Sequence, residues 1–438
     1  MTIQSGTAGD VSTVERHPGM EHPVTPFEFK SADSTIALLR DPYRFVSRRS
    51  AELGEAVFET RLLLRRTTCM TGAEAAGVFY DPARFQRAGA APPPLQKPLF
   101  GQGGVQGLDG EHHRQRKAMF LQINPPDRVE ALADVVTREW ERAVADWAAP
   151  DQVDLYPEVQ RLLTRAVCEW AGAPLSEAEV DLRTRQLTAL FDAAGDVGLG
   201  HLRSRAARRA AERWAADLIE QIRSGQLAVP SSSAASVIAN HQEPDGRPMA
   251  PRVAAVELLN VLRPTVATAV YIIFVAHALE ANPAWRERLA QGDGAEDMAF
   301  IEEVRRTYPF FPAVTAIVHE AFQWRGHDFP EGRRVLLDLY GTNRDPRAWE
   351  DPERFDPERF LGDDRDPFAF VPQGGGDPAV HHRCPGEPIS TRLMGIALDQ
   401  LVRHLTYTPV RPAAPIDYRR LPALPKGGYR IQNISPRH

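Results

Sequence analysis

The sequence has 438 residues, more than one hydrophobic core usually contains, so its length alone suggests two domains. Its 52 basic and 58 acidic residues give a net charge of −6, which does not indicate nucleic-acid binding. The three cysteines, Cys69, Cys168 and Cys384, are too few and too scattered for a disulfide framework, which fits the reducing cytoplasm.

The N-terminal third begins with a polar segment and then alternates short helices and strands. Residues 1–25 are predicted to be a disordered leader without the apolar stretch of a signal peptide. Residues 34–53 are predicted to form a helix with Asp33 or Ser34 as its N-cap. Strand-like runs over 57–64 and 67–70, separated by Arg65 and Arg66, precede a short helix over 73–80.

Residues 85–110 form a long irregular segment with six glycines and three consecutive prolines. Such a segment is either a functional lid or a linker. Its apolar residues favour a lid, because a linker rarely needs them. They are Leu95, Leu99, Phe100, Val105 and Leu108.

The next segment is helical. The spacing predicts a helix over 111–123, with His113 and Lys117 one turn apart on one face; this face is either a binding surface or simply solvated. Helices are expected to dominate 127–226. The arginines between 203 and 213 are predicted to form a solvated helix face.

Residues 254–281 are predicted to form a long apolar helix that Arg263 and Pro264 interrupt. Its most apolar run, 266–279, is too short to span a bilayer, so we expect a soluble protein without a membrane anchor. A guanidinium in such surroundings needs an anion beside it. Glu257 is six positions back on another face, which leaves a substrate carboxylate or a distant carboxylate of the fold as the partner.

A glycine-rich loop over 370–387 carries Cys384 to the start of an apolar helix over 387–405. A thiol at a helix N-terminus is biased towards the thiolate, which can bind a metal or act as a nucleophile. A buried structural cysteine is the alternative. His382 and Arg383 offer cationic donors suited to carboxylates.

Three motifs follow one another in the C-terminal half: Glu303-Val-Arg-Arg306, Pro357-Glu-Arg-Phe360 and the Cys384 loop. In this order they resemble the cytochrome P450 haem-thiolate family, and the resemblance extends from about residue 34 to the C-terminus. It implies one large haem-binding unit over 26–438, mainly α-helical with a small β-rich lobe, in place of two domains.

The resemblance also assigns roles to residues. It implies that Cys384 is the axial thiolate ligand of haem b iron, and that Glu303 and Arg306 lock to Arg359. The lid would cover the haem. The residues implied to contact the haem propionates are His113, Lys117 or the adjacent Arg116, His382 and Arg383.

Arg263 and Pro264 stand where oxygen-activating members of the family carry an acid followed by an alcohol. Neither residue relays a proton, so conventional oxygen activation is not expected. Together with Gln373-Gly-Gly-Gly376 and the fourteen positions between Phe370 and Cys384, the pair resembles the hydrogen-peroxide-dependent fatty-acid peroxygenase branch. This implies that Arg263 anchors a fatty-acid carboxylate, which supplies the missing acid–base group.

The product depends on the lid residue Gln106. Decarboxylating members of that branch have histidine at the matching position and hydroxylating members have glutamine, so Gln106 implies α- or β-hydroxy fatty acids over alkenes. Leu99, Phe100 and Phe310 would shape the substrate pocket, although Phe310 beside Phe311 is also typical of ordinary core.

The expected partners are a fatty acid and hydrogen peroxide, without a redox protein. A conventional monooxygenase that receives electrons from a ferredoxin or flavoprotein is the second hypothesis. A non-catalytic haem-thiolate sensor is the third, but it would need an output domain, and no part of the chain is left over for one.

Overall fold

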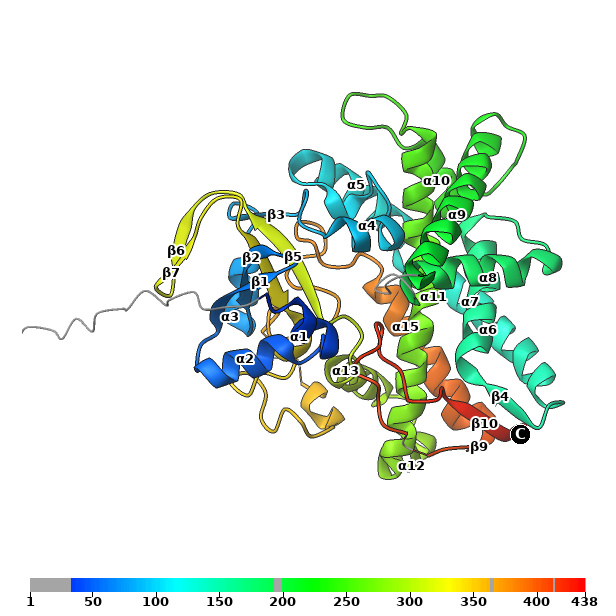
Figure 1. Cartoon of the computed structure of the whole chain (residues 1–438). Coiled ribbons are helices and arrows are strands. Elements are labelled where there is room, and N and C mark those ends of the chain that lie inside the picture. Colours follow the sequence, from blue (N-terminus) through cyan, green and yellow to red (C-terminus); the bar gives the residue numbers. More distant parts are fainter. Residues whose placement is uncertain (1–32, 193–198, 363–365, 413, 438) are drawn as a thin grey trace, which may run out of the picture.

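The computed structural model describes residues 33–192, 199–362, 366–412 and 414–437. The leader predicted for residues 1–25 lies outside these ranges. A β-rich half that contains α1 to α3 lies beside a larger helical half, and α11 runs through the middle (Figure 1). The expected mainly α-helical unit with a small β-rich lobe is confirmed.

The helices have the following bounds: α1 Thr35–Arg40, α2 Phe45–Leu53, α3 Ala73–Phe79, α4 Pro93–Leu99, α5 Gly110–Ile123, α6 Pro126–Trp147, α7 Leu155–Ala171, α8 Glu177–Asp192, α9 Leu199–Arg223, α10 Ala234–Asn240, α11 Pro251–Ala281, α12 Pro283–Gln291, α13 Asp297–Thr307, α14 Leu339–Thr342 and α15 Glu387–Asp399.

The strands form three sheets. The largest has the order β1-β2-β8-β5-β3, with β1 Val57–Leu62, β2 Arg65–Met70, β8 Arg334–Asp338, β5 Ala313–Val318 and β3 Phe85–Gln86. A second sheet joins β4 Gln152–Asp154, β10 Arg430–Pro436 and β9 Leu405–Pro409, and a hairpin pairs β6 Phe322–Trp324 with β7 His327–Phe329.

Helix α11 forms the centre of the core, where it packs against α7, α9 and α15. The sequence suggested that Arg263 and Pro264 interrupt this helix. In the structure, α11 continues through both residues. It is therefore long and apolar enough to cross a membrane, yet 94% of its most apolar window is buried in the fold. Its burial makes α11 the core helix of this fold.

Two sequence expectations for the β-rich half are wrong in detail. The helix expected over 34–53 is divided into α1 and α2, because Pro42 disfavours helical backbone at the residue before it. The β1–β2 turn lies at Leu63 and Leu64, whose φ angles are +53° and +61°, and not at Arg65 and Arg66. Two consecutive residues with positive φ match the twist of a tight hairpin.

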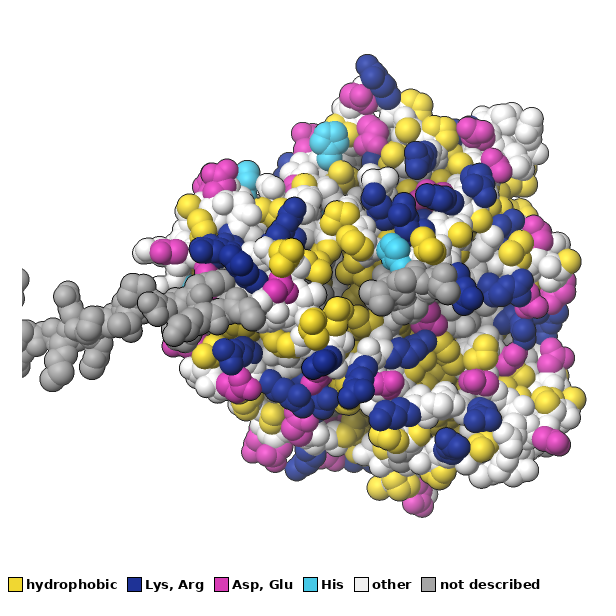
Figure 2. Space-filling view, in the orientation of Figure 1, with side chains coloured by type: hydrophobic (Ala, Val, Ile, Leu, Met, Phe, Trp, Pro, Cys, Tyr) yellow, Lys and Arg dark blue, Asp and Glu magenta, His cyan; other side chains and the backbone are white. Residues whose placement is uncertain are grey.

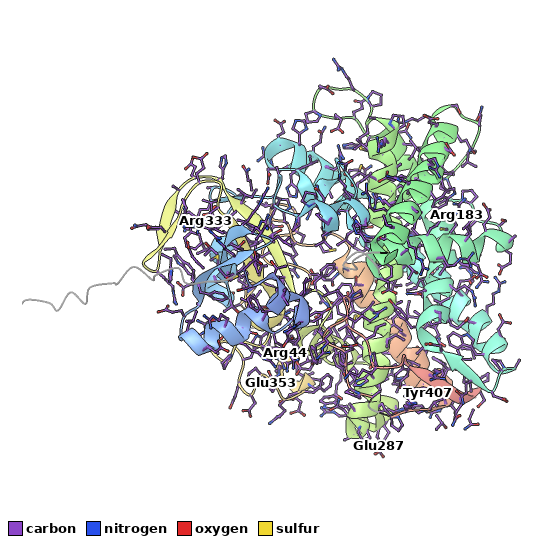
Figure 3. The ribbon with its side chains drawn as sticks, in the orientation of Figure 1. Arg44, Arg183, Glu287, Arg333, Glu353 and Tyr407 are labelled. Atoms are coloured by element: carbon purple, nitrogen blue, oxygen red, sulfur yellow. The ribbon has the colours of Figure 1, made fainter. Side chains whose placement is uncertain are left out.

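Cation–π contacts link several elements of the fold to one another. Arg44, just before α2, lies 4.3 Å from the ring centre of Tyr418 in the C-terminal segment. In the helical half, Arg183 of α8 lies over Trp214 of α9 at 4.6 Å. Figure 3 labels Arg44 and Arg183 in these two regions. Cation–π contacts of this kind add to the burial that holds neighbouring elements together.

The remaining cysteines and the C-terminal helix follow the sequence closely. Cys69 and Cys168 are buried, as expected of core residues. Helix α15 ends at Asp399, a π-helical turn follows over Gln400–His404, and β9 begins at Leu405, where the sequence suggested that the helix would end.

Candidate active site

The loop before α15 holds Cys384 by backbone contacts. Its N–H donates to the carbonyl of Gln373 at 3.0 Å, and the N–H of Gly386 donates to the thiol. Gly374 has a φ of +101°, and a Cβ there would lie 3.0 Å from the Cα of Arg383. The glycine-rich sequence is therefore required by the close approach of two backbone segments.

The expected thiolate bias at a helix N-terminus is outweighed by burial. Burial raises the pKa of the Cys384 thiol, although Gly386, Lys117 and Arg305 act in the opposite direction. Helix α15 begins three residues later, at Glu387. A bound metal cation is the kind of group that would hold this sulfur as a thiolate.

A buried ion-pair network lies directly behind the loop. Arg305 of α13 binds both Glu387 and the Oε1 of Gln373, and the Nε of Arg383 donates to Glu387 at 2.6 Å. Arg383, expected to face a propionate, thus has part of its guanidinium committed to Glu387. The sequence reasoning missed Arg305, and its only signal was its place beside the motif residue Arg306.

Three of the expected propionate contacts come together between α5 and the cysteine loop. His113 stacks on His382 with ring centres 3.9 Å apart, and the Nε2 of His382 lies 3.7 Å from Asp109. Lys117 donates to the carbonyls of His381 and Arg383. Burial lowers the pKa of Lys117 to about 8, that of His113 to about 3 and that of His382 to about 4.

This donor set fits a group that carries carboxylates. Within the described parts of the chain, the buried ammonium of Lys117 has carbonyl oxygens but no carboxylate at ion-pair distance. Arg116, the alternative to Lys117, points elsewhere, because it pairs with Glu243 and with Glu257 at 2.6 Å. A buried cation without an anion is unfavourable, and a haem propionate would supply one.

Arg263 lies on α11 with 6% of its surface exposed. Its Nη1 has no hydrogen-bond partner within the described residues, and its guanidinium lies 5.7 Å from the ring centre of Phe100. Burial lowers its pKa to about 9. Glu257 does not pair with it, as expected, since Glu257 accepts from Arg116 and from the backbone N–H of Val105 at 2.9 Å.

The lid segment lies against α11 one turn before Arg263. Gln106 accepts a hydrogen bond from Asn260 at 3.2 Å, and Asn260 in turn donates to Glu257 at 2.8 Å. Leu99 is buried at the end of α4. The segment is more regular than the sequence suggested, because it contains α4 and a 3-10 turn, Val105–Gly107.

Hydrophobic side chains surround a hollow between the two halves, below α4 in this view (Figure 2).

Among the described residues, none of the ring contacts and hydrogen bonds that we observe for Phe310 involves Arg263 or the lid. Its ring packs on Tyr271 of α11 at 4.2 Å, and its carbonyl accepts from the hydroxyl of Tyr43. These contacts favour the alternative interpretation of Phe310 as ordinary core.

The Glu303 motif is arranged as the resemblance implied. Arg306 donates to both oxygens of Glu303 at 2.7 Å, and Arg359 lies 3.5 Å from the same carboxylate. Arg306 also donates to the carbonyls of Asn343 and Pro352. The network fixes the segment before the cysteine loop, since both partners are completely buried.

Comparisons with known proteins agree with this geometry. Residues 298–432 match the family model of cytochrome P450. "Putative cytochrome P450 138" of Mycobacterium tuberculosis is 27% identical over 358 residues, which cover 76% of this chain and 79% of the relative. Solved cytochrome P450 structures that are 30% to 51% identical match 93% of this chain. The class defined by the fold and these matches is a haem-thiolate oxidoreductase, and the chain belongs to the cytochrome P450 family, in which a cysteine thiolate binds haem.

Solved structures define the branch. A variant of cytochrome P450SP alpha (CYP152B1) is 51% identical, with a TM-score of 0.91 over 93% of this chain and 100% of that one. Cytochrome P450EX alpha (CYP152N1), solved with myristic acid, is 38% identical with a TM-score of 0.90; 93% of this chain and 98% of that one are covered. A variant of cytochrome P450 OleT with arachidonic acid is 30% identical with the same TM-score and coverage. These relatives place the chain in the CYP152 branch.

Proposed function

We propose that the chain is a peroxygenase that uses hydrogen peroxide to hydroxylate long-chain fatty acids at the α or β carbon. The observation that carries the proposal is the buried guanidinium of Arg263, whose Nη1 has no partner among the described residues. A fatty-acid carboxylate would neutralise it. Relatives with 38% and 30% identity were solved with myristic and arachidonic acid, which supports the same class of ligand.

The cofactor would be haem b, with Cys384 holding its iron through the thiolate and His113, Lys117 and His382 holding its propionates. When bound, the haem iron supplies the oxidation chemistry. The protein's own task is to exclude water and to position the fatty acid. Because Arg263 would anchor the carboxylate, the carbons that react would be those next to it, the α and β carbons.

The residues around Arg263 leave the acid–base task to the substrate. Pro264 has neither a hydroxyl nor an N–H. The hydroxyls of Thr265 and Thr268 donate to the carbonyls of Val261 and Pro264, at 2.9 and 3.3 Å, so both are engaged with the backbone of α11. A carboxylate bound to Arg263 would hold and return the proton that none of these side chains relays.

The experiment separates the carboxylate from the rest of the substrate. Short carboxylic acids should restore peroxide-driven oxidation of a substrate that lacks a carboxylate, and the matching primary amides should not. Oxidation that is equally fast with acid, amide or no additive would contradict the proposal.

The scattered cysteines also lead us to propose a cytoplasmic location.

A further inference from the structure

The sequence suggested that the arginines of α9 form a solvated helix face. In the structure this face is not uniformly solvated. Arg203, Arg209 and Arg213 are exposed, whereas Arg208 is only 3% exposed. The Nε of Arg208 donates to Glu212 at 2.7 Å, and its Nη2 donates to the carbonyl of Phe100 at 3.4 Å. Its Nη1 is buried without a hydrogen-bond partner among the described residues.

Arg208 is built into the contact between the lid and α11. Gly101 has a φ of +79°, and a Cβ at that position would lie 2.0 Å from the Nη2 of Arg208 and 3.0 Å from Val256 of α11. Any larger residue would displace the guanidinium. The lid residue Phe100 therefore touches Arg208 through its carbonyl and faces Arg263 with its ring.

Two buried guanidiniums thus flank one lid residue, and each has an N–H group without an acceptor. Their mutual repulsion adds to burial in lowering the pKa of Arg263. Glu212 compensates the charge of Arg208 only at Nε, and Glu257 is bound to Arg116, Asn260 and the lid backbone. An incoming carboxylate carries the negative charge and the acceptor oxygens that these two buried guanidiniums lack.

We propose that Arg208 is a second carboxylate-recognition residue, which together with Arg263 determines the preference of this site for fatty acids over uncharged lipids. The inference rests on the proposed function and deepens it. Arg263 would bind the carboxylate beside the haem, and Arg208 would donate from α9 across the lid.

The test is a binding titration of the haem-loaded protein with dodecanoic acid and with its methyl ester. Binding is measured from the absorption change and by calorimetry. Arg208→Gln should raise the Kd of the acid at least tenfold and that of the ester less than threefold. Arg208→Lys should recover part of the loss. Arg209→Gln, at an exposed neighbour, is the control and should change neither Kd.

The double variant Arg208→Gln/Glu212→Gln removes the pair together and should show the same selective loss, which guards against a folding defect from an unpaired Glu212. An acid Kd within threefold of the unmodified protein would overturn the inference. Equal weakening of acid and ester would also overturn it, because Arg208 would then only hold the lid. If Arg263→Gln abolishes the acid preference while Arg208→Gln retains it, the inference fails and the proposed function stands.

Discussion

At the scale of single residues, two buried arginines show how the partner of a guanidinium determines its role. Arg306 is fully buried and donates to both oxygens of Glu303 and to three backbone carbonyls. Arg263 is almost as buried, but its Nη1 has no partner among the described residues. The first arrangement stabilises the fold, and the second is suited to an anion that comes from outside the chain.

The two arginines should therefore respond differently to substitution. Arg306→Ala removes both short hydrogen bonds from the buried Glu303 carboxylate, leaving it Arg359 at 3.5 Å, and should lower the free energy of unfolding by about 3–5 kcal/mol. Arg263→Gln removes an unpaired charge and should leave stability and haem uptake nearly unchanged, while acid binding is lost. Urea unfolding and a fatty-acid titration of both variants provide the comparison. A large loss of stability in Arg263→Gln would assign that residue to the fold instead.

The identity of residue 106 should affect the product. Gln106 is oriented by Asn260 and cannot be protonated near neutral pH, whereas histidine can. We expect the unmodified protein to form mostly hydroxy acids and Gln106→His to shift the products towards terminal alkenes. Chromatography of the products from one fatty acid measures the ratio. Mostly alkene from the unmodified protein would show that glutamine here does not determine the outcome.

Sequence reasoning reached Arg263 because a charge inside an apolar helix is visible without a structure. It did not reach Arg208 or Arg305, because their neighbours come from distant segments. Arg208 meets the lid about a hundred residues earlier, and Arg305 meets Glu387 about eighty residues later. A basic residue on a helix is exposed or buried according to what packs on it, and that information is absent from local spacing.

At the scale of elements, the lid and α11 behave as a joined pair. The carboxylate of Glu257 binds Arg116 of α5, the N–H of Val105 in the lid and the side chain of Asn260. One buried acid thereby connects α5 and the lid to α11, the helix that carries Arg263. Its place explains why an acid occurs on an otherwise apolar helix.

Glu257→Gln should loosen the lid more than the fold. Glutamine keeps one acceptor oxygen but removes the charge that faces Arg116, whose other carboxylate, Glu243, is partly exposed. We expect amide hydrogen exchange over 101–108 to become roughly tenfold faster, which corresponds to about 1.4 kcal/mol. Glu280→Gln, near the other end of α11, is the matched control. Unchanged exchange in the lid would show that Glu257 does not hold it.

The lid also shows where element prediction failed. Its glycines concealed α4, although Pro93 and Pro94 at the first helical positions are a known start signal.

The β1–β2 turn was misplaced because leucines rarely adopt positive φ. Here the Thr35 hydroxyl and the Asp33 carboxylate accept hydrogen bonds from the backbone N–H groups of Leu63 and Leu64. The helix predicted over 111–123 matches α5, and the helical character predicted for 127–226 matches α6 to α9, because helical spacing is a local property of the sequence.

At the scale of the whole molecule, stability should depend on pH through Asp338, at the end of β8. Burial raises the pKa of this carboxyl from 3.8 to about 7. Between about pH 4 and pH 7 the folded chain then binds a proton that the unfolded chain has lost, so stability falls as the pH rises through this window. The contribution is at most about 4 kcal/mol.

Asp338→Asn removes this titration. We expect Asp338→Asn to be more stable, relative to the unmodified protein, at pH 8 than at pH 5. Denaturant unfolding at both pH values measures this as a larger difference in the free energy of unfolding, variant minus unmodified, at pH 8. Asp151→Asn, at an exposed position, should show no such difference. Parallel stability curves for Asp338→Asn and the unmodified protein would contradict the role assigned to burial.

In the proposed function, the substrate carboxylate and peroxide together replace the electron supply and proton relay of a conventional monooxygenase. The most direct measurement is to incubate the haem-loaded protein with hydrogen peroxide and a long-chain fatty acid, without any reductase, and to identify the products by mass spectrometry. We expect α- or β-hydroxy fatty acid from the unmodified protein and none from Arg263→Ala. No product with peroxide, together with turnover when a ferredoxin or flavoprotein supplies electrons, would contradict it.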